Sequence, residues 1–116
     1  MLFVWYPKCT TCQRAKKWLD EHGMQYEMRD IKEENPSAQE LQEWYVKSGQ
    51  PLRRFFNTSG LLYKGMGLKE KLPTMSEEEQ IQLLSEYGML VKRPLVITED
   101  QVLIGFKEAE WDTQLK

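Results

Sequence analysis

YPKCTTCQR, residues 6–14, contains both cysteines of the chain, Cys9 and Cys12, three positions apart. The residues before it, Leu2–Trp5, are typical of a short β-strand. After it, apolar side chains recur at helical spacing as far as Leu19, with charged residues between them. We therefore predict a strand, a tight loop and a helix, with Cys9 at or just before the first turn of that helix.

The remaining strand signals lie on both sides of a long helical middle. Gly23 is typical of a helix end, and residues 25–31 alternate as a second strand would. Residues 95–98 and 102–104 are apolar runs joined by a polar turn, which predicts a hairpin. A strand–helix–strand unit is parallel and a hairpin is antiparallel, so we expect a mixed four-stranded sheet.

The helical middle has two clear start signals. Asn35-Pro36 is interpreted as an N-cap followed by proline at the first helical position, and residues 76–79 as a capping box. Residues 57–60 are expected to form a turn, and Gly88 to close the last helix of this segment. The apolar residues predicted to face the core here are Leu41, Trp44, Tyr45, Phe55, Phe56, Leu61, Leu62, Tyr63, Ile81, Leu84 and Tyr87.

A length of 116 residues corresponds to one domain. We predict a single α/β domain over residues 1–116 with a thioredoxin-like plan: a mixed four-stranded sheet with a helical insertion at about residues 36–88. A last amphipathic segment, with Ala109, Trp111 and Leu115, is expected to lie against the sheet.

Composition and charge exclude several classes of protein. Hydrophobic residues make up 41% of the chain and charged residues 29%, which is typical of a globular protein, and the net charge of -2 offers no electrostatic case for nucleic acid or anionic membranes. No run approaches the roughly 20 apolar residues that span a bilayer. Pro7 and Lys8 interrupt the opening apolar run, unlike a secretory signal. We expect a cytoplasmic protein.

The cysteine pair predicts thiol redox chemistry. The reactive species is the thiolate, whereas a cysteine with the ordinary pKa of about 8.5 is mostly protonated at neutral pH. Free N–H groups and the partial positive charge of a helix N-terminus favour the anion at Cys9. Cys12 lies one turn further on, where it can attack a mixed disulfide formed at Cys9. Neighbours expected to assist Cys9 are Lys8, Arg14, Thr10 and Thr11.

Two other interpretations of the cysteines were considered. Structural zinc requires four ligands, and His22 is the only other good candidate in the chain, so we predict no metal site. Free cysteines can also fill space as small apolar side chains. From composition alone, Arg93-Pro94 is interpreted as a trans proline at a strand start beside a solvated arginine, because only ~5% of such bonds are cis.

Residues 7–12, residues 93–97 and the helical segment between them together resemble the arsenate reductase (ArsC) family, which also contains the Spx transcription regulators. The resemblance covers essentially the whole chain. It implies a thioredoxin-like fold with a helical insertion, Cys9 as the nucleophile, Arg93 as an anion-binding residue and Pro94 as a cis-proline facing the active site. In arsenate reductases the nucleophile attacks arsenate and is regenerated with glutathione and glutaredoxin. The implied reductant is therefore a small thiol or a glutaredoxin- or thioredoxin-type protein, with no bound cofactor.

The chain departs from the arsenate reductases at two of their three arginines. Asn57 stands where the second should fall, and residues 105–107 contain no arginine where the third should fall. Fewer guanidinium groups predict weaker binding of a tetrahedral oxyanion. The cysteine pair and residues 105–108 are more similar to Spx, which binds the α-subunit of RNA polymerase and uses its cysteines as a redox switch.

The sequence thus predicts a thiol–disulfide oxidoreductase with Cys9, Cys12 and Arg93 as its catalytic residues. The alternative is an Spx-like redox-switched regulator that binds the polymerase α-subunit. Substrate contacts are predicted from Lys8, Thr10, Thr11, Asn57 and Pro94.

Overall fold

The computed structural model describes residues 1–115 and contains one sheet with the strand order β2-β1-β3-β4. The strands are β1 (Leu2–Trp5), β2 (Glu27–Asp30), β3 (Leu95–Ile97) and β4 (Val102–Ile104). β1 pairs in parallel with β2 and antiparallel with β3, and β3 pairs antiparallel with β4. The predicted mixed four-stranded sheet is confirmed.

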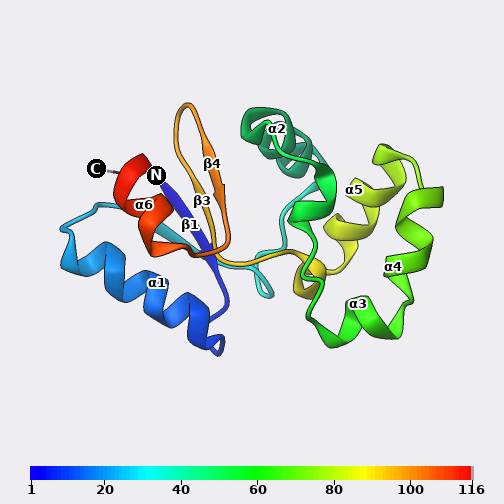
Figure 1. The fold of residues 1–116 in the computed structure, drawn as a ribbon, viewed down its shortest axis with the longest axis horizontal. Helices are drawn as coiled ribbons and strands as arrows, with labels where there is room; N and C mark the ends of the chain where they lie inside the picture. Colours follow the sequence, from blue (N-terminus) through cyan, green and yellow to red (C-terminus); the bar gives the residue numbers. More distant parts are fainter. Residues whose placement is uncertain (116) are drawn as a thin grey trace.

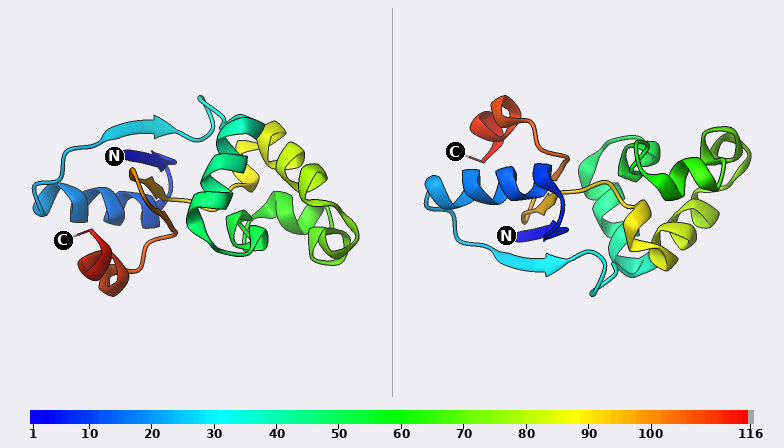
Figure 2. Two further views of the ribbon diagram at one scale, coloured as in Figure 1. Left: turned by 90° about the horizontal axis from the view of Figure 1, so that it is seen from above. Right: turned by 90° about the horizontal axis from the view of Figure 1, so that it is seen from below.

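Helices α1 (Thr10–Glu21) and α6 (Glu108–Gln114) cover one face of this sheet, as Figures 1 and 2 show. Successive strand residues point to opposite faces, so Phe3 lies on this side while Val4 lies on the other. Trp111 is fully buried and its indole N–H donates to Gly105 O at 3.2 Å. The core of this layer consists of Phe3, Ala15, Trp18, Leu19, Val96, Leu103 and Trp111. The expectation for Ala109 is wrong, because its side chain is exposed.

The helical insertion packs beside the other face of the sheet (Figure 1). Its helices are α2 (Ala38–Ser48), α3 (Leu61–Gly65), α4 (Leu68–Lys71) and α5 (Glu77–Glu86), with 3₁₀ turns η1 (Leu52–Phe55), η2 (Leu72–Thr74) and η3 (Gly88–Leu90). Buried side chains from all these helices form one core with Val4, Leu95 and Ile104 of the sheet. The two parts therefore share a continuous apolar interior.

The start of α2 differs from the prediction. Its N-cap is Ser37, whose hydroxyl accepts from Glu40 N at 3.1 Å while Glu40 Oε1 accepts from Ser37 N at 3.0 Å. This reciprocal pair satisfies two free backbone donors, which Asn35-Pro36 could not do. The Asn35 side chain instead donates to Ser85 O, near the end of α5, at 2.7 Å. At α5 the predicted capping box of Ser76 and Glu79 is confirmed.

Three predicted details of the insertion are also wrong. Tyr87 is 41% exposed, because α5 ends at Glu86 and the backbone of Tyr87 is extended. Gly88 begins the 3₁₀ turn η3 instead of closing the helix. Leu61 is 89% exposed and Leu62 is 38% exposed, since α3 is a short helix that turns only Tyr63 inward. The two leucines are consequently available at the surface.

Two contacts join the insertion to the sheet layer, and a bridge between Phe56 and Val91, which follows η3, ties the end of the insertion to its middle. Arg29 on β2 donates to Glu40 Oε1 on α2 at 2.8 Å. At Gly88 an added Cβ would lie 2.2 Å from the carbonyl oxygen of Ile31, so only glycine permits this approach.

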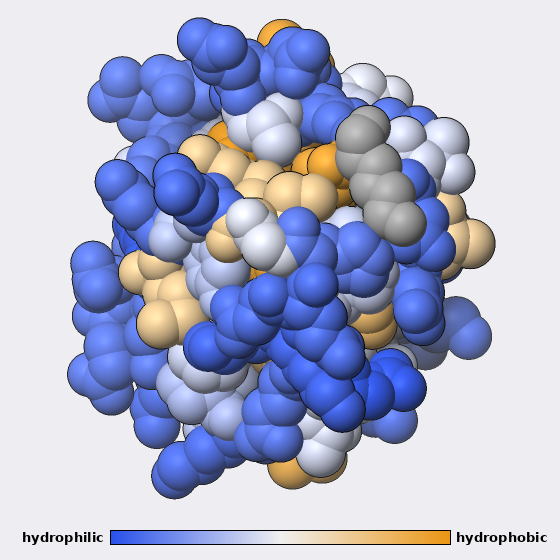
Figure 3. Space-filling view, turned by 90° about the vertical axis from the view of Figure 1, so that its left-hand side faces the viewer, coloured by the Kyte–Doolittle hydropathy of each residue, from blue (hydrophilic) through white to orange (hydrophobic). Residues whose placement is uncertain are grey.

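The end of the molecule that carries α1 and α6 is covered mainly by hydrophilic residues, with smaller apolar areas between them (Figure 3). Among residues 1–115, none of the helices has the length and apolar character needed to cross a membrane.

Candidate active site

Cys9 is the N-cap residue of α1, immediately after the turn that follows β1. Its backbone is extended, its N–H donates to Tyr6 O at 3.0 Å, and its carbonyl accepts from Gln13 N at 3.0 Å. No side chain within the described part of the chain caps this helix start. The first-turn N–H groups are therefore left to interact with the Cys9 sulfur.

The surroundings of Cys9 favour its thiolate. Partial burial raises the pKa of Cys9, but hydrogen bonds from the backbone and side chain of Cys12, the charge of Arg93 and a backbone hydrogen bond from Thr11 oppose it. Their sum places the pKa of Cys9 below its ordinary value. The predicted helix effect thus acts through particular backbone donors at the start of α1.

Cys12 has the opposite character. Its side chain is fully buried, and this burial is the main cause that raises the pKa of Cys12 to about 12. A hydrogen bond from Tyr6 N, at 3.5 Å from the Cys12 sulfur, lowers this pKa, while the neighbouring Cys9 raises it. Both cysteines are free thiols. The surroundings of the pair therefore favour the thiolate at Cys9 and the protonated thiol at Cys12, with a hydrogen bond between the two side chains.

Arg93 comes from the segment that precedes β3 and faces the cysteines. Its peptide bond to Pro94 is cis, which confirms the expectation from the family resemblance and overturns the one from composition. The guanidinium lies over the Tyr6 ring, 5.2 Å from the ring centroid, and Nη1 donates to Met89 O at 3.3 Å. Its Nε is buried and has no partner in the described part of the molecule. Arg93 therefore retains an unused hydrogen-bond donor near the Cys9 sulfur.

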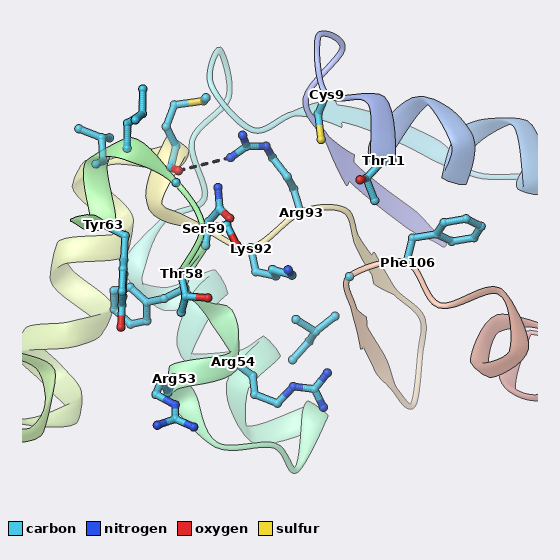
Figure 4. A pocket seen from close by; sticks show the side chains of 18 of the residues that line it. Cys9, Thr11, Arg53, Arg54, Thr58, Ser59, Tyr63, Lys92, Arg93 and Phe106 are labelled. Atoms are coloured by element: carbon cyan, nitrogen blue, oxygen red, sulfur yellow. Dashed lines mark hydrogen bonds between the residues drawn. The ribbon is translucent and has the colours of Figure 1, made fainter. Parts of the chain in front are cut away.

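A cleft of about 1330 Å³ opens from Cys9 between the sheet layer and the insertion (Figure 4). Of the residues predicted from the sequence, it brings together Cys9, Thr11, Asn57 and Arg93.

The other predicted site residues lie outside the cleft lining. Lys8 and Thr10 are exposed, as is Arg14, and none of the three is among the main causes of the lowered pKa of Cys9. Cys12 and Pro94 are buried beneath the surface of the cleft.

Besides the predicted Arg93, the cleft contains positive charges that the sequence interpretation did not assign to the site. These belong to Arg53, Arg54, Lys69, Lys92 and Lys107. Within residues 1–115, no Asp or Glu lines the cleft. Arg53-Arg54 and Lys92-Arg93 are adjacent pairs in the sequence, a local signal that the small net charge of -2 concealed.

Groups of three or more His, Cys, Asp or Glu side chains placed to hold a metal ion do not occur among residues 1–115. The reactive groups that the structure does bring together here are two cysteine sulfurs beside cationic side chains.

Comparison with known proteins agrees with this geometry. The family model described as "ArsC family" matches residues 4–114. The chain belongs to the ArsC family. The Bacillus subtilis protein YusI, described as uncharacterized, is 52% identical over 97% of this chain and 95% of its own length. A crystal structure described as a putative ArsC family related protein from Bacteroides fragilis is 56% identical, covers 97% of this chain and 94% of its own, and superposes with a TM-score of 0.93.

The global transcriptional regulator Spx of Enterococcus faecalis is also similar to this ArsC-family chain. The two are 27% identical over 90% of this chain and 77% of Spx.

Proposed function

We propose that this ArsC-family protein is a cytoplasmic thiol–disulfide oxidoreductase in which Cys9 is the nucleophile and Cys12 the resolving thiol. The single observation that carries this proposal is the contrast between the two sulfurs. Cys9 lines a cationic cleft and its pKa is lowered, while Cys12 is buried behind Cys9 and its pKa is raised to about 12. An attacking thiol must be ionised and accessible, and a resolving thiol need only reach its partner.

The proposed reaction proceeds in two exchanges. The Cys9 thiolate attacks one sulfur of a substrate disulfide, so that a mixed disulfide forms and the other substrate sulfur leaves as a thiolate. Cys12 then releases its proton to solvent and attacks the Cys9 sulfur, which expels the second substrate thiolate. The substrate gains two electrons, and the pair becomes a Cys9–Cys12 disulfide.

The first exchange prepares the second. Before attack, the neighbouring Cys9 raises the pKa of Cys12, in addition to the larger effect of burial. Once Cys9 is held in a mixed disulfide, its negative charge is gone, while Tyr6 N still donates to the Cys12 sulfur. The pKa of Cys12 therefore falls at the step where its thiolate is required. This order keeps the resolving thiol unreactive until a substrate is bound.

A small thiol such as glutathione, or a glutaredoxin- or thioredoxin-type protein, would return the Cys9–Cys12 disulfide to its reduced form. This reductant acts by the same exchange chemistry and requires no bound cofactor. Recovery of the chain in the soluble fraction of the cell, with thiols reduced, is the check on its proposed location.

Disulfides fit the site better than arsenate does. Arg93 lies beside Cys9, but Asn57 replaces a guanidinium with a neutral amide, and Lys107 offers a point charge in place of a bidentate donor. Glutaredoxin-dependent turnover of arsenate tests this. A turnover that equals the rate with a disulfide substrate would contradict our preference.

The deciding experiment is reduction of insulin, or a glutaredoxin-coupled assay, with two matched variants. Cys9→Ser removes the nucleophile and should abolish activity, whereas Cys12→Ser should stop the reaction at the mixed disulfide, visible as an adduct by mass spectrometry. Wild-type activity in Cys9→Ser would refute the proposal. An absence of adduct in Cys12→Ser would refute the assigned order of the two thiols.

The second candidate function is a redox-switched regulator, favoured by the similarity to Spx over 90% of this chain. In this case the Cys9–Cys12 disulfide would alter binding to the α-subunit of RNA polymerase. A pull-down with the isolated C-terminal domain of that subunit, under reducing and oxidising conditions, distinguishes this candidate. An absence of binding in both states would exclude it.

A further inference from the structure

We propose that the cleft binds an acidic polypeptide segment that carries the disulfide presented to Cys9. This inference rests on the proposed function, because it names the substrate class of the same site. Disulfide chemistry alone would need only the two thiols and Arg93, yet five further cations line the cleft. The structure therefore provides binding groups well beyond those that the sulfur exchange requires.

The charges are arranged along the cleft instead of around the sulfur. Figure 4 shows Cys9 and Arg93 at one end, Arg53 and Arg54 at the other, and Lys92 between them. The cleft volume of about 1330 Å³ exceeds the usual range of about 300–1,000 Å³ for small-molecule pockets. Such a row fits an extended chain with repeated negative charges, and a single inorganic oxyanion would contact only one end of it.

The cations of the cleft have no carboxylate counter-ion within the described part of the chain. The Arg54 guanidinium donates to the neutral Gln50 Oε1 at 3.0 Å, and the buried Nε of Arg93 has no hydrogen-bond partner among residues 1–115. An acidic ligand would therefore gain charge pairs without first breaking existing ones.

An apolar wall lies beside the charges. Leu61, 89% exposed, and Leu62, 38% exposed, line the cleft together with the partly buried Phe106. The aromatic residues of the cleft offer little surface, because Phe56 and Tyr63 are buried and Phe106 is partly buried, so the most exposed part of the wall is aliphatic. Aliphatic side chains pack against apolar residues of a peptide, whereas grooves that bind single-stranded nucleic acid offer exposed aromatic rings on which bases stack. A polypeptide can also carry the cysteine that the reaction needs. The geometry therefore favours an acidic segment with an aliphatic residue near its cysteine.

The test uses three peptides of the same length, each with one cysteine and one leucine at the same positions. The residues around these two are all Glu in the first peptide, all Gln in the second and all Lys in the third. Each is supplied as a mixed disulfide with a chromogenic thiol. We expect kcat/KM to follow the order Glu, Gln, Lys, and the Glu preference to shrink as salt screens the charges. Arg53→Gln/Arg54→Gln should reduce the Glu-to-Gln ratio about tenfold, since each exposed pair contributes a few-fold.

Lys17→Gln/Lys32→Gln is the control with the same change in net charge. Both lysines are exposed and lie outside the cleft lining. This variant should keep the wild-type Glu-to-Gln ratio. Equal rates for all three peptides, or an equal loss in both double variants, would overturn the inference.

A binding measurement separates this inference from the proposed reaction. Fluorescence anisotropy with Cys9→Ser protein and peptides that carry serine in place of cysteine requires no chemistry. Tight binding of the Glu peptide that depends on Arg53 and Arg54 supports the cleft assignment even if no disulfide is reduced. A single-stranded oligonucleotide of matched charge that binds as tightly, with the same dependence, would overturn the choice of a polypeptide.

Discussion

The sheet layer and the helical insertion contribute different kinds of side chain to one cleft. The sheet layer, comprising β1–β4, α1 and α6, supplies Cys9 and the buried Cys12, and its core is built around large aromatic side chains. The insertion, comprising α2–α5, supplies Arg53, Arg54 and the exposed Leu61 from short helices. The difference indicates that both thiols belong to the sheet layer, whereas the cations of the cleft come from both parts. Arg53, Arg54 and Lys69 lie in the insertion, and Lys92, Arg93 and Lys107 lie in segments next to the sheet.

Trp111→Ala is expected to have the largest effect on stability, and it tests how far the sheet layer depends on its aromatic core. The indole is fully buried between α6 and the sheet, contacts the Trp18 and Phe106 rings, and donates to Gly105 O. Truncation of such a side chain costs about 3–5 kcal/mol. Urea unfolding measures this change in the free energy of unfolding. A loss below about 1 kcal/mol would show that the sheet layer does not depend on its aromatic core.

Gly88→Ala tests the junction between the two parts. An added Cβ would lie 2.2 Å from Ile31 O and 2.4 Å from Asn35 Oδ1, so the insertion must shift against the sheet layer. We expect a loss of about 1–3 kcal/mol in the free energy of unfolding. Gly65→Ala is the matched control, because nothing lies within 4 Å of the added atom there. Equal stability of the two variants would contradict the close approach at Gly88.

The Arg29–Glu40 pair tests the same junction through pH. Hydrogen bonds from Arg29 are the main cause that lowers the pKa of Glu40 to about 2, from an ordinary 4.5. A carboxyl with a lowered folded-state pKa adds stability that is present above pH 4.5 and is lost as the pH falls towards 2. Glu40→Gln should therefore reduce stability at pH 7 by about 1 kcal/mol, because the pair is partly solvated.

The difference between Glu40→Gln and the wild type should shrink as the pH falls from 4.5 to 2. Urea unfolding at several pH values across this range measures it. A difference that is constant with pH would mean that the ion pair does not contribute through the charge of Glu40.

Arg93→Met is expected to have the smallest effect of these variants. It tests how far the pKa of Cys9 depends on a charge that lies outside α1. The Arg93 charge is one of several causes that lower the pKa of Cys9, after the hydrogen bonds from Cys12. Its removal should raise the pKa of Cys9, measured by the pH dependence of alkylation by iodoacetamide. Lys92→Met, which alters another cation of the cleft, serves as the comparison and should raise it less. The same pKa in Arg93→Met and wild type would assign the effect to the start of α1 alone.

Features with a local cause could be predicted from the sequence. The position of Cys9 at a helix start follows from the strand, loop and helix around it, and the box at Ser76 follows from its own four residues. The cap of α2 was mispredicted because two candidate caps, Asn35 and Ser37, lie two residues apart. The Asn35 side chain hydrogen-bonds to Ser85, which is distant in the sequence, and leaves Ser37 as the cap. Local patterns carry no information about such a partner.

The cationic cleft could not be predicted in the same way. Its charges come from segments far apart in the chain, such as Arg53 on η1, Lys92 before β3 and Lys107 before α6, and only the fold places them along one surface. The net charge of -2 averages over the whole molecule and hides this separation. The exposure of Leu61 likewise depends on how α3 packs, which its apolar sequence does not reveal.

The most direct test of the account is a titration of the two thiols in the wild-type protein, followed by thiolate absorbance. We predict that the pKa of Cys9 lies below its ordinary value, while Cys12 stays protonated until about pH 12. Cys9→Ser should remove the first step and move the second to lower pH, because Cys9 raises the pKa of Cys12. Two thiols that ionise together at the ordinary pKa would contradict the assignment of Cys9 as nucleophile and Cys12 as resolving thiol.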